Sequence, residues 1–306
     1  MGLLFIFIDG LGIGPDVENN PLYQHEWAGF EGFSTGKLTS GGFNAATSAT
    51  HLTRSIDANL DVEGLPQSGT GQASLFSGEN ASKLLGRHHG PYPHTQIKPL
   101  LAEPSIFGKA LKLGYRCHFM NAYPERFFEY AEKHNRWSCT TKMCISNGIR
   151  LNRTEDVLEN RAITAEIYQD FWQKHLGINL PDIDEYEAAR RLQRAAEQND
   201  LVIYEFYLTD KAGHDKSHES AMDALSRIDK LLQALPAEFD FDNHTLFITS
   251  DHGNIEDLSV KTHTRNPVPL MVYGPGAELF SRAGTLTDVT PAAISWLQQF
   301  RNPVHS

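Results

Sequence analysis

Phe247-Ile-Thr-Ser-Asp-His-Gly-Asn254 is the stretch of sequence from which the fold and the chemistry of this chain can be inferred. The apolar run 245–248 has the length and the residue types of a buried strand. It leads into Asp251 and His252, whose side chains converge only where the strand breaks into a loop, as Gly253 permits. A carboxylate beside an imidazole is a ligand pair for Zn²⁺ or Mn²⁺. Taken alone, the stretch fits a turn with a solvated Asp251 equally well.

Two further apolar runs also end in an acid. Residues 3–8 and 201–208 are predicted to be buried strands, because strands covered on both faces are continuously apolar. Asp9 follows the first run and Asp210 follows the second. Ligands of open α/β sheets bind at the carboxyl ends of the strands. We therefore expect both acids to lie at the same sheet edge as Asp251, although Asp9 alone is also typical of an Asx turn.

Two more histidines complete a possible set of metal ligands. His214 follows Asp210 by four residues, a spacing that a helix, or a tight loop, brings to one face. His263 lies in the loop after the third strand, within the run 263–269. Three Asp and three His side chains supply enough ligands for two divalent cations about 4 Å apart. Carboxylates gathered at one edge would repel one another strongly without such cations.

The glycine-rich segment 64–78 is predicted to contain a nucleophile. Gln72 to Phe76 has the composition of the first turns of a helix, and a tight turn precedes it. A hydroxyl at that place lies against free backbone N–H groups and the positive end of the helix, which also bind phosphate oxygens. Ser68 and Thr70 both meet this requirement by position. The alternative is a glycine-rich turn with an N-capping serine.

Composition and charge limit the class of protein. The chain has 306 residues, 40% hydrophobic and 21% charged, as expected for an enzyme with one large domain or a core with an insert. The net charge of −11 gives no general attraction for nucleic acid or anionic membranes. Three cysteines, an odd number without metal-binding spacing, predict reduced thiols in the cytoplasm. No run is long enough for a signal peptide or a membrane span, and the oligomeric state is left open.

Five segments together resemble the alkaline phosphatase superfamily, and within it the metalloenzyme branch of cofactor-independent phosphoglycerate mutase and phosphopentomutase. These segments are Asp9, residues 68–72, residues 210–214, residues 251–253 and residues 263–269. The resemblance favours Ser68 over Thr70 as nucleophile, because Gly78 then falls where related phosphodiesterases keep a glycine. Gln72 is a departure, since the mutases have His at this position. The sulfatase branch is excluded, because no Cys or Ser is followed by x-Pro-x-Arg.

The resemblance implies a fold and a set of ligands. The expected fold is α/β, with a doubly wound core that has a mostly parallel sheet between helices and a small inserted cap. We expect the core to comprise residues 1–122 and 186–306, and the cap residues 123–185. The resemblance assigns one metal ion to Asp9, Ser68, Asp251 and His252. It assigns the other ion to Asp210, His214 and His263.

The predicted activity is two-metal phosphoryl transfer through a phosphoserine at Ser68. Hydrolysis of a small phosphate ester is expected, because the cap is short and Gln72 replaces the histidine of the mutases. One alternative is a phosphomutase of the phosphoglycerate or phosphopentose type, and a second is a non-catalytic binding protein on the same scaffold. Mn²⁺ and Zn²⁺ fit the ligands alike. Candidate substrate contacts, for which an exposed polar loop is the simpler interpretation, are Arg87, His88, His89 and Arg126.

Overall fold

Strand β1, Leu3–Ile8, is an interior strand of a sheet in the computed structural model of the chain, which describes residues 1–301. It pairs in parallel with β5 on one side and with β6 on the other. The remaining strands complete a seven-stranded mixed sheet in the order β2-β3-β7-β6-β1-β5-β4. These strands are β2 (Ala46–Thr47), β3 (His51–Ile56), β4 (Cys117–Phe119), β5 (Leu201–Phe206), β6 (Thr245–Thr249) and β7 (Val268–Tyr273).

The sheet has a parallel half and an antiparallel half. Strands β6, β1, β5 and β4 run parallel, so their carboxyl ends meet at one edge. Beyond β6, strands β7, β3 and β2 each run antiparallel to their neighbour. The predicted α/β class is confirmed, and the parallel half contains the three strands that the sequence predicted to end in an acid.

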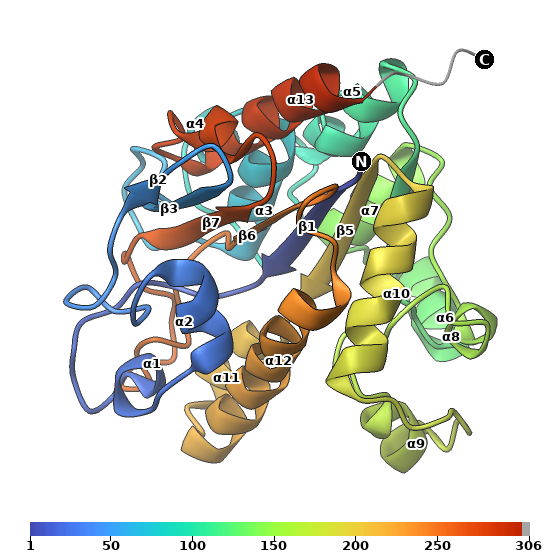
Figure 1. Cartoon of the computed structure of the whole chain (residues 1–306), viewed down its shortest axis with the longest axis horizontal. Coiled ribbons are helices and arrows are strands. Elements are labelled where there is room, and N and C mark those ends of the chain that lie inside the picture. Colours follow the sequence, from blue (N-terminus) through green and yellow to red (C-terminus); the bar gives the residue numbers. More distant parts are fainter. Residues whose placement is uncertain (302–306) are drawn as a thin grey trace.

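Helices cover both faces of the sheet because alternate residues of β1 point to opposite sides (Figure 1). Phe5 and Phe7 belong to one apolar cluster, and the Phe5 ring stacks on Phe247 with 4.2 Å between ring centroids. Leu4 and Ile6 belong to a second cluster on the other face. Strands buried on both faces are therefore continuously apolar, as the sequence predicted.

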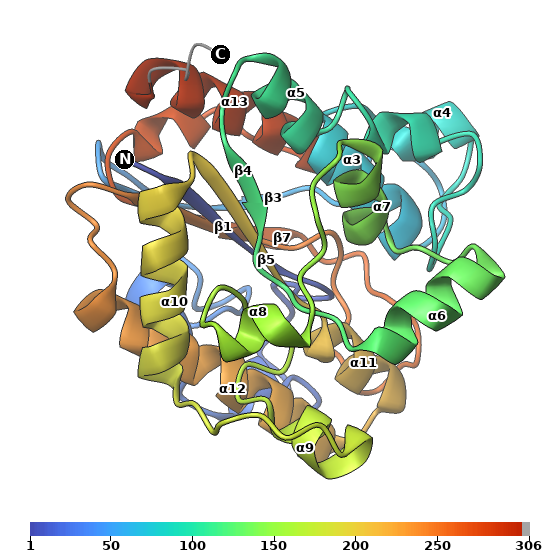
Figure 2. The same cartoon turned by 90° about the vertical axis from the view of Figure 1, so that its right-hand side faces the viewer.

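The first face is covered by α3 (Ser68–Ser77), α4 (Ala81–Leu85), α5 (Ile106–Lys112), α7 (Cys139–Ser146) and α13 (Val289–Phe300), together with 3₁₀ turns at Lys98–Leu101, Ala277–Phe280 and Leu286–Asp288. The second face is covered by α1 (Pro21–Gln24), α2 (Ala28–Ser34), α10 (Glu185–Gln198), α11 (Leu208–Asp215) and α12 (His218–Glu238). The segment between β4 and β5 also holds α6 (Glu125–His134), α8 (Thr154–Leu158) and α9 (Asp170–Leu176), as Figure 2 shows.

In the segment 123–185, predicted to be a cap, one part packs against the sheet and another part forms a separate apolar cluster. Helix α7 inserts Cys139 and Met143 into the same apolar cluster as Phe5, so it packs as part of the core. By contrast, Val157 and Trp172 belong to a small separate cluster within the segment. The boundaries of the cap stay a prediction, and α7 ties the segment to the sheet.

Two predicted element boundaries are wrong. Strand β5 ends at Phe206 and not at Leu208, so Asp210 lies in the first turn of α11. Helix α3 begins at Ser68 itself and not at Gln72. Both differences have the same cause. Asp210 and Ser68 lie in the first turn of a helix, and each helix begins earlier in the chain than the apolar pattern indicates.

Two further observations concern the whole described chain. All three cysteines are free thiols, and Cys139 and Cys144 are buried. Between residues 1 and 301, no helix combines the length and the apolar character needed to cross a membrane.

Candidate metal centre

The carboxyl ends of β1 and β6 and the N-terminus of α3 bring four predicted ligands together. The ligand atoms of Asp9, Asp251 and His252 lie within 4.8 Å of one another. Nε2 of His252 is 3.5 Å from Oδ1 of Asp9 and 3.4 Å from Oδ2 of Asp251. Oγ of Ser68 is 3.0 Å from the same Nε2 atom. All four residues are buried, so the site that the sequence assigned to one ion is a compact set of oxygen and nitrogen donors.

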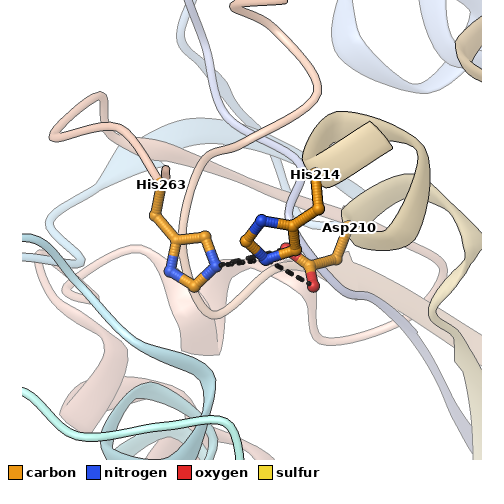
Figure 3. Close-up of side chains that lie close together, drawn as sticks. All are labelled: Asp210, His214 and His263. Carbon is orange, nitrogen blue, oxygen red and sulfur yellow. Dashed lines mark hydrogen bonds and ion pairs between the residues drawn. The ribbon is translucent and has the colours of Figure 1, made fainter. Parts of the chain in front are cut away.

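A second set of donors forms at the N-terminus of α11, and Figure 3 shows its three side chains pointing toward one another. Asp210 and His214 are on one face of the helix, with Oδ2 and Nε2 3.4 Å apart. His263 reaches the same place from its loop, with Nε2 3.4 Å from Oδ1 of Asp210 and 3.0 Å from Nε2 of His214. These are the three residues that the sequence assigned to the other ion.

The two histidines of the second set are oriented for cation binding. Nδ1 of His214 lies 2.9 Å from the Lys261 carbonyl, and Nδ1 of His263 lies 2.6 Å from the Pro66 carbonyl. A carbonyl only accepts, so each Nδ1 carries the proton and each Nε2 presents a lone pair to the centre. The Asp210 carboxylate raises the pKa of His214 to about 9. Without a cation, His214 therefore takes up a second proton, which a bound metal would replace.

Buried atoms without partners show that the first set also fits a cation. Oδ1 of Asp9 and Oδ2 of Asp251 are buried, and no hydrogen-bond donor reaches either atom within residues 1–301. Burial raises the pKa of Asp9, and the nearby carboxylates of Asp251, Asp210 and Glu205 raise it further. Buried carboxylates are unfavourable unless a positive charge compensates them. Divalent cations held by Asp and His donors supply that charge.

Two glycines allow the loops of the centre to approach one another. A Cβ atom on Gly71 of α3 would lie 2.8 Å from the carbonyl oxygen of Asp251. Gly10 has a φ of +73°, and a Cβ atom there would lie 2.8 Å from Cα of Asp210. A side chain at either position would push α3 or α11 away from the end of its neighbouring strand.

Glu256 holds the loops of the centre together and was not singled out from the sequence. Its buried carboxylate accepts hydrogen bonds from the backbone N–H of Gly12 at 3.1 Å and of Asn254 at 2.8 Å, and from the Thr264 hydroxyl. The side chain of Asn254 in turn donates to Oδ1 of Asp210 at 2.7 Å. The sequence signal for Glu256 is an acid within the loop that carries Asp251 and His252.

Gln72 and Glu205 are two more polar side chains beside the centre. Nε2 of Gln72, the residue that departs from the mutase pattern, donates to Oδ2 of Asp9 at 3.0 Å. Glu205, near the end of β5, accepts a hydrogen bond from the Thr140 hydroxyl at 2.7 Å. Burial raises the pKa of Glu205 to about 7. Glu205 was not predicted as a site residue, and its signal in the sequence is an acid inside an otherwise apolar strand.

The centre opens into a cavity of about 1120 Å³. Asp9, Ser68 and Asp210 line the cavity, and so does Arg126 from α6, one of the predicted substrate contacts.

The other three predicted contacts, Arg87, His88 and His89, are not among the residues that line this cavity. His88 instead hydrogen bonds with the Ser82 hydroxyl of α4 and with the Val62 carbonyl, so it links its own loop to these two segments.

Comparison with known proteins places the chain in a family. The model of the metalloenzyme superfamily matches residues 1–299, and the chain therefore belongs to this superfamily of metal-dependent enzymes. The resemblance to the metalloenzyme branch that the sequence motifs indicated is confirmed.

Individual relatives agree with this assignment. The phosphoglycerate mutase of Mycoplasmoides gallisepticum, described as independent of 2,3-bisphosphoglycerate, is 28% identical over 132 residues. That match covers 38% of this chain and 26% of the relative, so the chain spans about a quarter of the length of this curated relative.

Two solved structures share the fold. Alkaline phosphatase from the Antarctic bacterium TAB5 superposes with a TM-score of 0.56 and 11% identity, covering 98% of each chain. Phosphoglycerate mutase from Leishmania mexicana superposes with a TM-score of 0.51 and 12% identity, covering 99% of this chain and 96% of the mutase. At this level of identity the likeness shows the fold alone, and it confirms the alkaline-phosphatase-like architecture.

We predict that each chain binds two divalent cations and that the second set of donors holds one of them. Asp210→Ala and His214→Ala should each lower the metal content by about one ion per chain, because each removes a donor that no neighbour replaces. Elemental analysis after dialysis against Mn²⁺ or Zn²⁺ measures this loss. His218→Ala, an exposed histidine in α12, is the control and should leave the content unchanged. Wild-type protein that retains neither metal would contradict the prediction.

We predict that Glu205 lowers the stability of the metal-free protein as the pH rises. The folded-state pKa of about 7 lies above the ordinary value of 4.5, so the folded state keeps a proton that the unfolded chain loses. The stabilisation is complete below about pH 4.5 and is lost as the pH rises to about 7, on the order of 3 kcal/mol in all. Urea unfolding of chelator-treated protein measures this.

Glu205→Gln should remove this part of the pH dependence, and Glu129→Gln, at an exposed position of α6, should retain it. The Glu205 assignment fails if the unfolding free energies of wild type and Glu205→Gln run parallel between pH 5 and pH 8.

Proposed function

We propose that this chain is a two-metal phosphoryl-transfer enzyme in which Ser68 is the nucleophile and becomes a phosphoserine. The observation that carries the proposal is the position of the Ser68 hydroxyl, 3.0 Å from Nε2 of His252 and beside the cluster of Asp9, Asp251 and His252. A non-catalytic binding protein would not require six Asp and His side chains to gather into two sets beside a serine hydroxyl.

The N-terminus of α3 supports the choice of Ser68. Ser68 is the first residue of the helix, so the N–H groups of Ser68 and Gly69 have no partner within it. These groups and the positive helix end are suited to bind phosphoryl oxygens. Thr70 is fully buried, and its hydroxyl lies 3.2 Å from the Gln67 carbonyl. Its hydroxyl is therefore engaged within the turn, away from the cavity.

The chemistry follows from what these groups do together. When bound, divalent cations supply Lewis acidity, which lowers the pKa of a serine hydroxyl and offsets the charge on the phosphoryl oxygens. Oγ of Ser68, having lost its proton to solvent, attacks phosphorus in line. The P–O bond to the leaving group breaks, and the leaving oxygen takes a proton from water as the alcohol departs into the cavity. The N-terminus of α3 holds two of the equatorial oxygens during this step. Mn²⁺ and Zn²⁺ are both suited to these oxygen and nitrogen donors.

We propose that water accepts the phosphoryl group, so that the enzyme hydrolyses a small phosphate ester. The large cavity beside Ser68 gives water access to the phosphoserine. Gln72 has no titratable proton, and its amide is bound to Asp9. It therefore lacks the acid–base capacity that a histidine at this position would have.

The second candidate is a phosphomutase, which returns the phosphoryl group to another hydroxyl of the same substrate. It is favoured by the name of the matched relative, phosphoglycerate mutase. A mutase must retain its dephosphorylated intermediate and exclude water from the phosphoserine.

We infer a core of residues 1–122 and 186–306 and a cap of residues 123–185. The cap supplies Arg126 and Trp172 to the cavity wall, and it would cover a bound substrate. The net charge of −11 supports a small phosphorylated ligand held by metal over a nucleic-acid or membrane partner. The three free thiols support a location in the cytoplasm.

We predict that Ser68→Ala abolishes turnover while the fold and most of the metal remain. The loss should be at least about 1,000-fold, because the covalent route is removed. Thr70→Ala should cost less than about tenfold, since this hydroxyl does not face the cavity. Steady-state rates and mass spectrometry of a trapped phosphopeptide containing residue 68 measure the effect. The opposite ranking of the two variants would assign the nucleophile to Thr70.

We predict that the enzyme releases inorganic phosphate and does not form an isomeric ester. Incubation of the Mn²⁺ or Zn²⁺ enzyme with 3-phosphoglycerate, ribose 1-phosphate and ribose 5-phosphate tests this, with phosphate and isomers followed together. Ser68→Ala controls for contaminating phosphatases. Conversion to the isomer without phosphate release would establish the mutase alternative.

A further inference from the structure

Four exposed aromatic rings line the cavity that contains Ser68. They are Tyr92 in the loop after α4, Tyr130 in α6, Phe171 in α9 and Tyr207 just before α11, and they are 39%, 48%, 41% and 42% exposed. A single exposed aromatic residue needs no explanation, but several around one cavity mark a ligand-binding surface. The mechanism proposed for Ser68 makes no use of these rings.

Two cations, Arg136 and Lys211, lie beside three of these rings. The guanidinium carbon of Arg136 is 5.8 Å from the centre of the Tyr92 ring, and Nη1 of Arg136 donates to the Tyr130 hydroxyl at 3.2 Å. Nζ of Lys211 is 6.0 Å from the centre of the Phe171 ring. None of the ion pairs among the described residues involves Arg136 or Lys211, and both cations therefore remain available to a ligand.

Helix α11 connects these groups to the metal centre. Asp210, a predicted metal ligand, precedes Lys211 in the chain, and both line the cavity. Nζ of Lys211 lies 6.0 Å from the centre of the Phe171 ring of α9, and Tyr130 of α6 lines the same cavity. A phosphoryl group at Ser68 would therefore have the rest of its molecule directed toward the aromatic walls.

The size and chemistry of the walls indicate what that molecule is. The cavity of about 1120 Å³ is at the upper end of the range for drug-sized ligands. A three-carbon or five-carbon phosphate has no flat apolar face to place against Tyr130 or Phe171. A planar ring does, because aromatic side chains stack on it and the neighbouring cations attract its π face.

We propose that the substrate is a phosphate monoester whose alcohol carries a planar aromatic ring, with nucleoside monophosphates as the class. The ring stacks against Tyr130 or Phe171 while the phosphoryl group lies at Ser68. This inference rests on the proposed function for the position of the phosphoryl group, and it adds the identity of the leaving alcohol.

The test compares two ligands that differ only by the base. Adenosine 5′-monophosphate and ribose 5-phosphate share the same phosphate and the same sugar carbon that bears it. Calorimetry with Mn²⁺-loaded Ser68→Ala protein measures the binding of each without turnover. Adenosine 5′-monophosphate should bind about tenfold tighter or more, as expected for stacking of one base. Equal affinities would overturn the proposal.

Ring variants identify the cause of the difference. Added to the Ser68→Ala protein, at least one of Phe171→Leu and Tyr130→Leu should reduce the preference for adenosine 5′-monophosphate, while the affinity for ribose 5-phosphate stays the same in both. Tyr186→Leu, at an exposed tyrosine outside the cavity, is the matched control and should change neither. If the preference survives in both ring variants, the rings do not bind the base and the proposal is wrong.

A separate measurement distinguishes this inference from the proposed function. Phosphate release by wild-type enzyme from ribose 5-phosphate tests phosphoryl transfer without any base. Release from both ligands at equal kcat/KM would support the proposed function and overturn the inference. Tighter binding of adenosine 5′-monophosphate without phosphate release from either ligand would support the inference and contradict the proposed function.

Discussion

The accumulation of negative charge at one edge of the sheet is the constraint on which the rest of this structure depends. Because β1, β5 and β6 are parallel, Asp9, Asp210 and Asp251 converge where their strands end. Three carboxylates in a largely buried place repel one another unless cations or donors compensate them. The surrounding loops are accordingly built around donors: Asn254 binds Asp210, and Gln72 binds Asp9.

The two sets of donors respond to this charge differently. Asp9 is buried, and both its burial and the neighbouring carboxylates raise its pKa. Burial would raise the pKa of Asp210 as well, but the adjacent His214 and His263 side chains outweigh this effect and lower it. Protons compete with a metal ion for carboxylate and imidazole ligands, so metal affinity should fall as the pH falls. The second set of donors is reached by solvent through the half-exposed side chain of His214.

The cavity extends the same edge of the sheet into a place for substrate. Helix α3 contributes Ser68 to the cavity lining and α11 contributes Asp210 and Lys211, while the segment between β4 and β5 contributes Tyr130, Arg136 and Phe171. Helix α7 belongs to that segment but packs in the core cluster, so it fixes one end of the segment against α3. Membership of the metalloenzyme superfamily accounts for the metal-binding character of this edge.

The sequence by itself determined the strands and the six Asp and His positions of the two sets. It could do so because a continuous apolar run ends in an acid at a defined edge, and because Asp210 and His214 are four residues apart on one helix. Only the tertiary structure decided the roles of Glu256 and Glu205 and the absence of His88 and His89 from the cavity. Thr140, 65 residues from Glu205, is its hydrogen-bond partner. Such a contact depends on how distant segments pack, and no local pattern of residues encodes it.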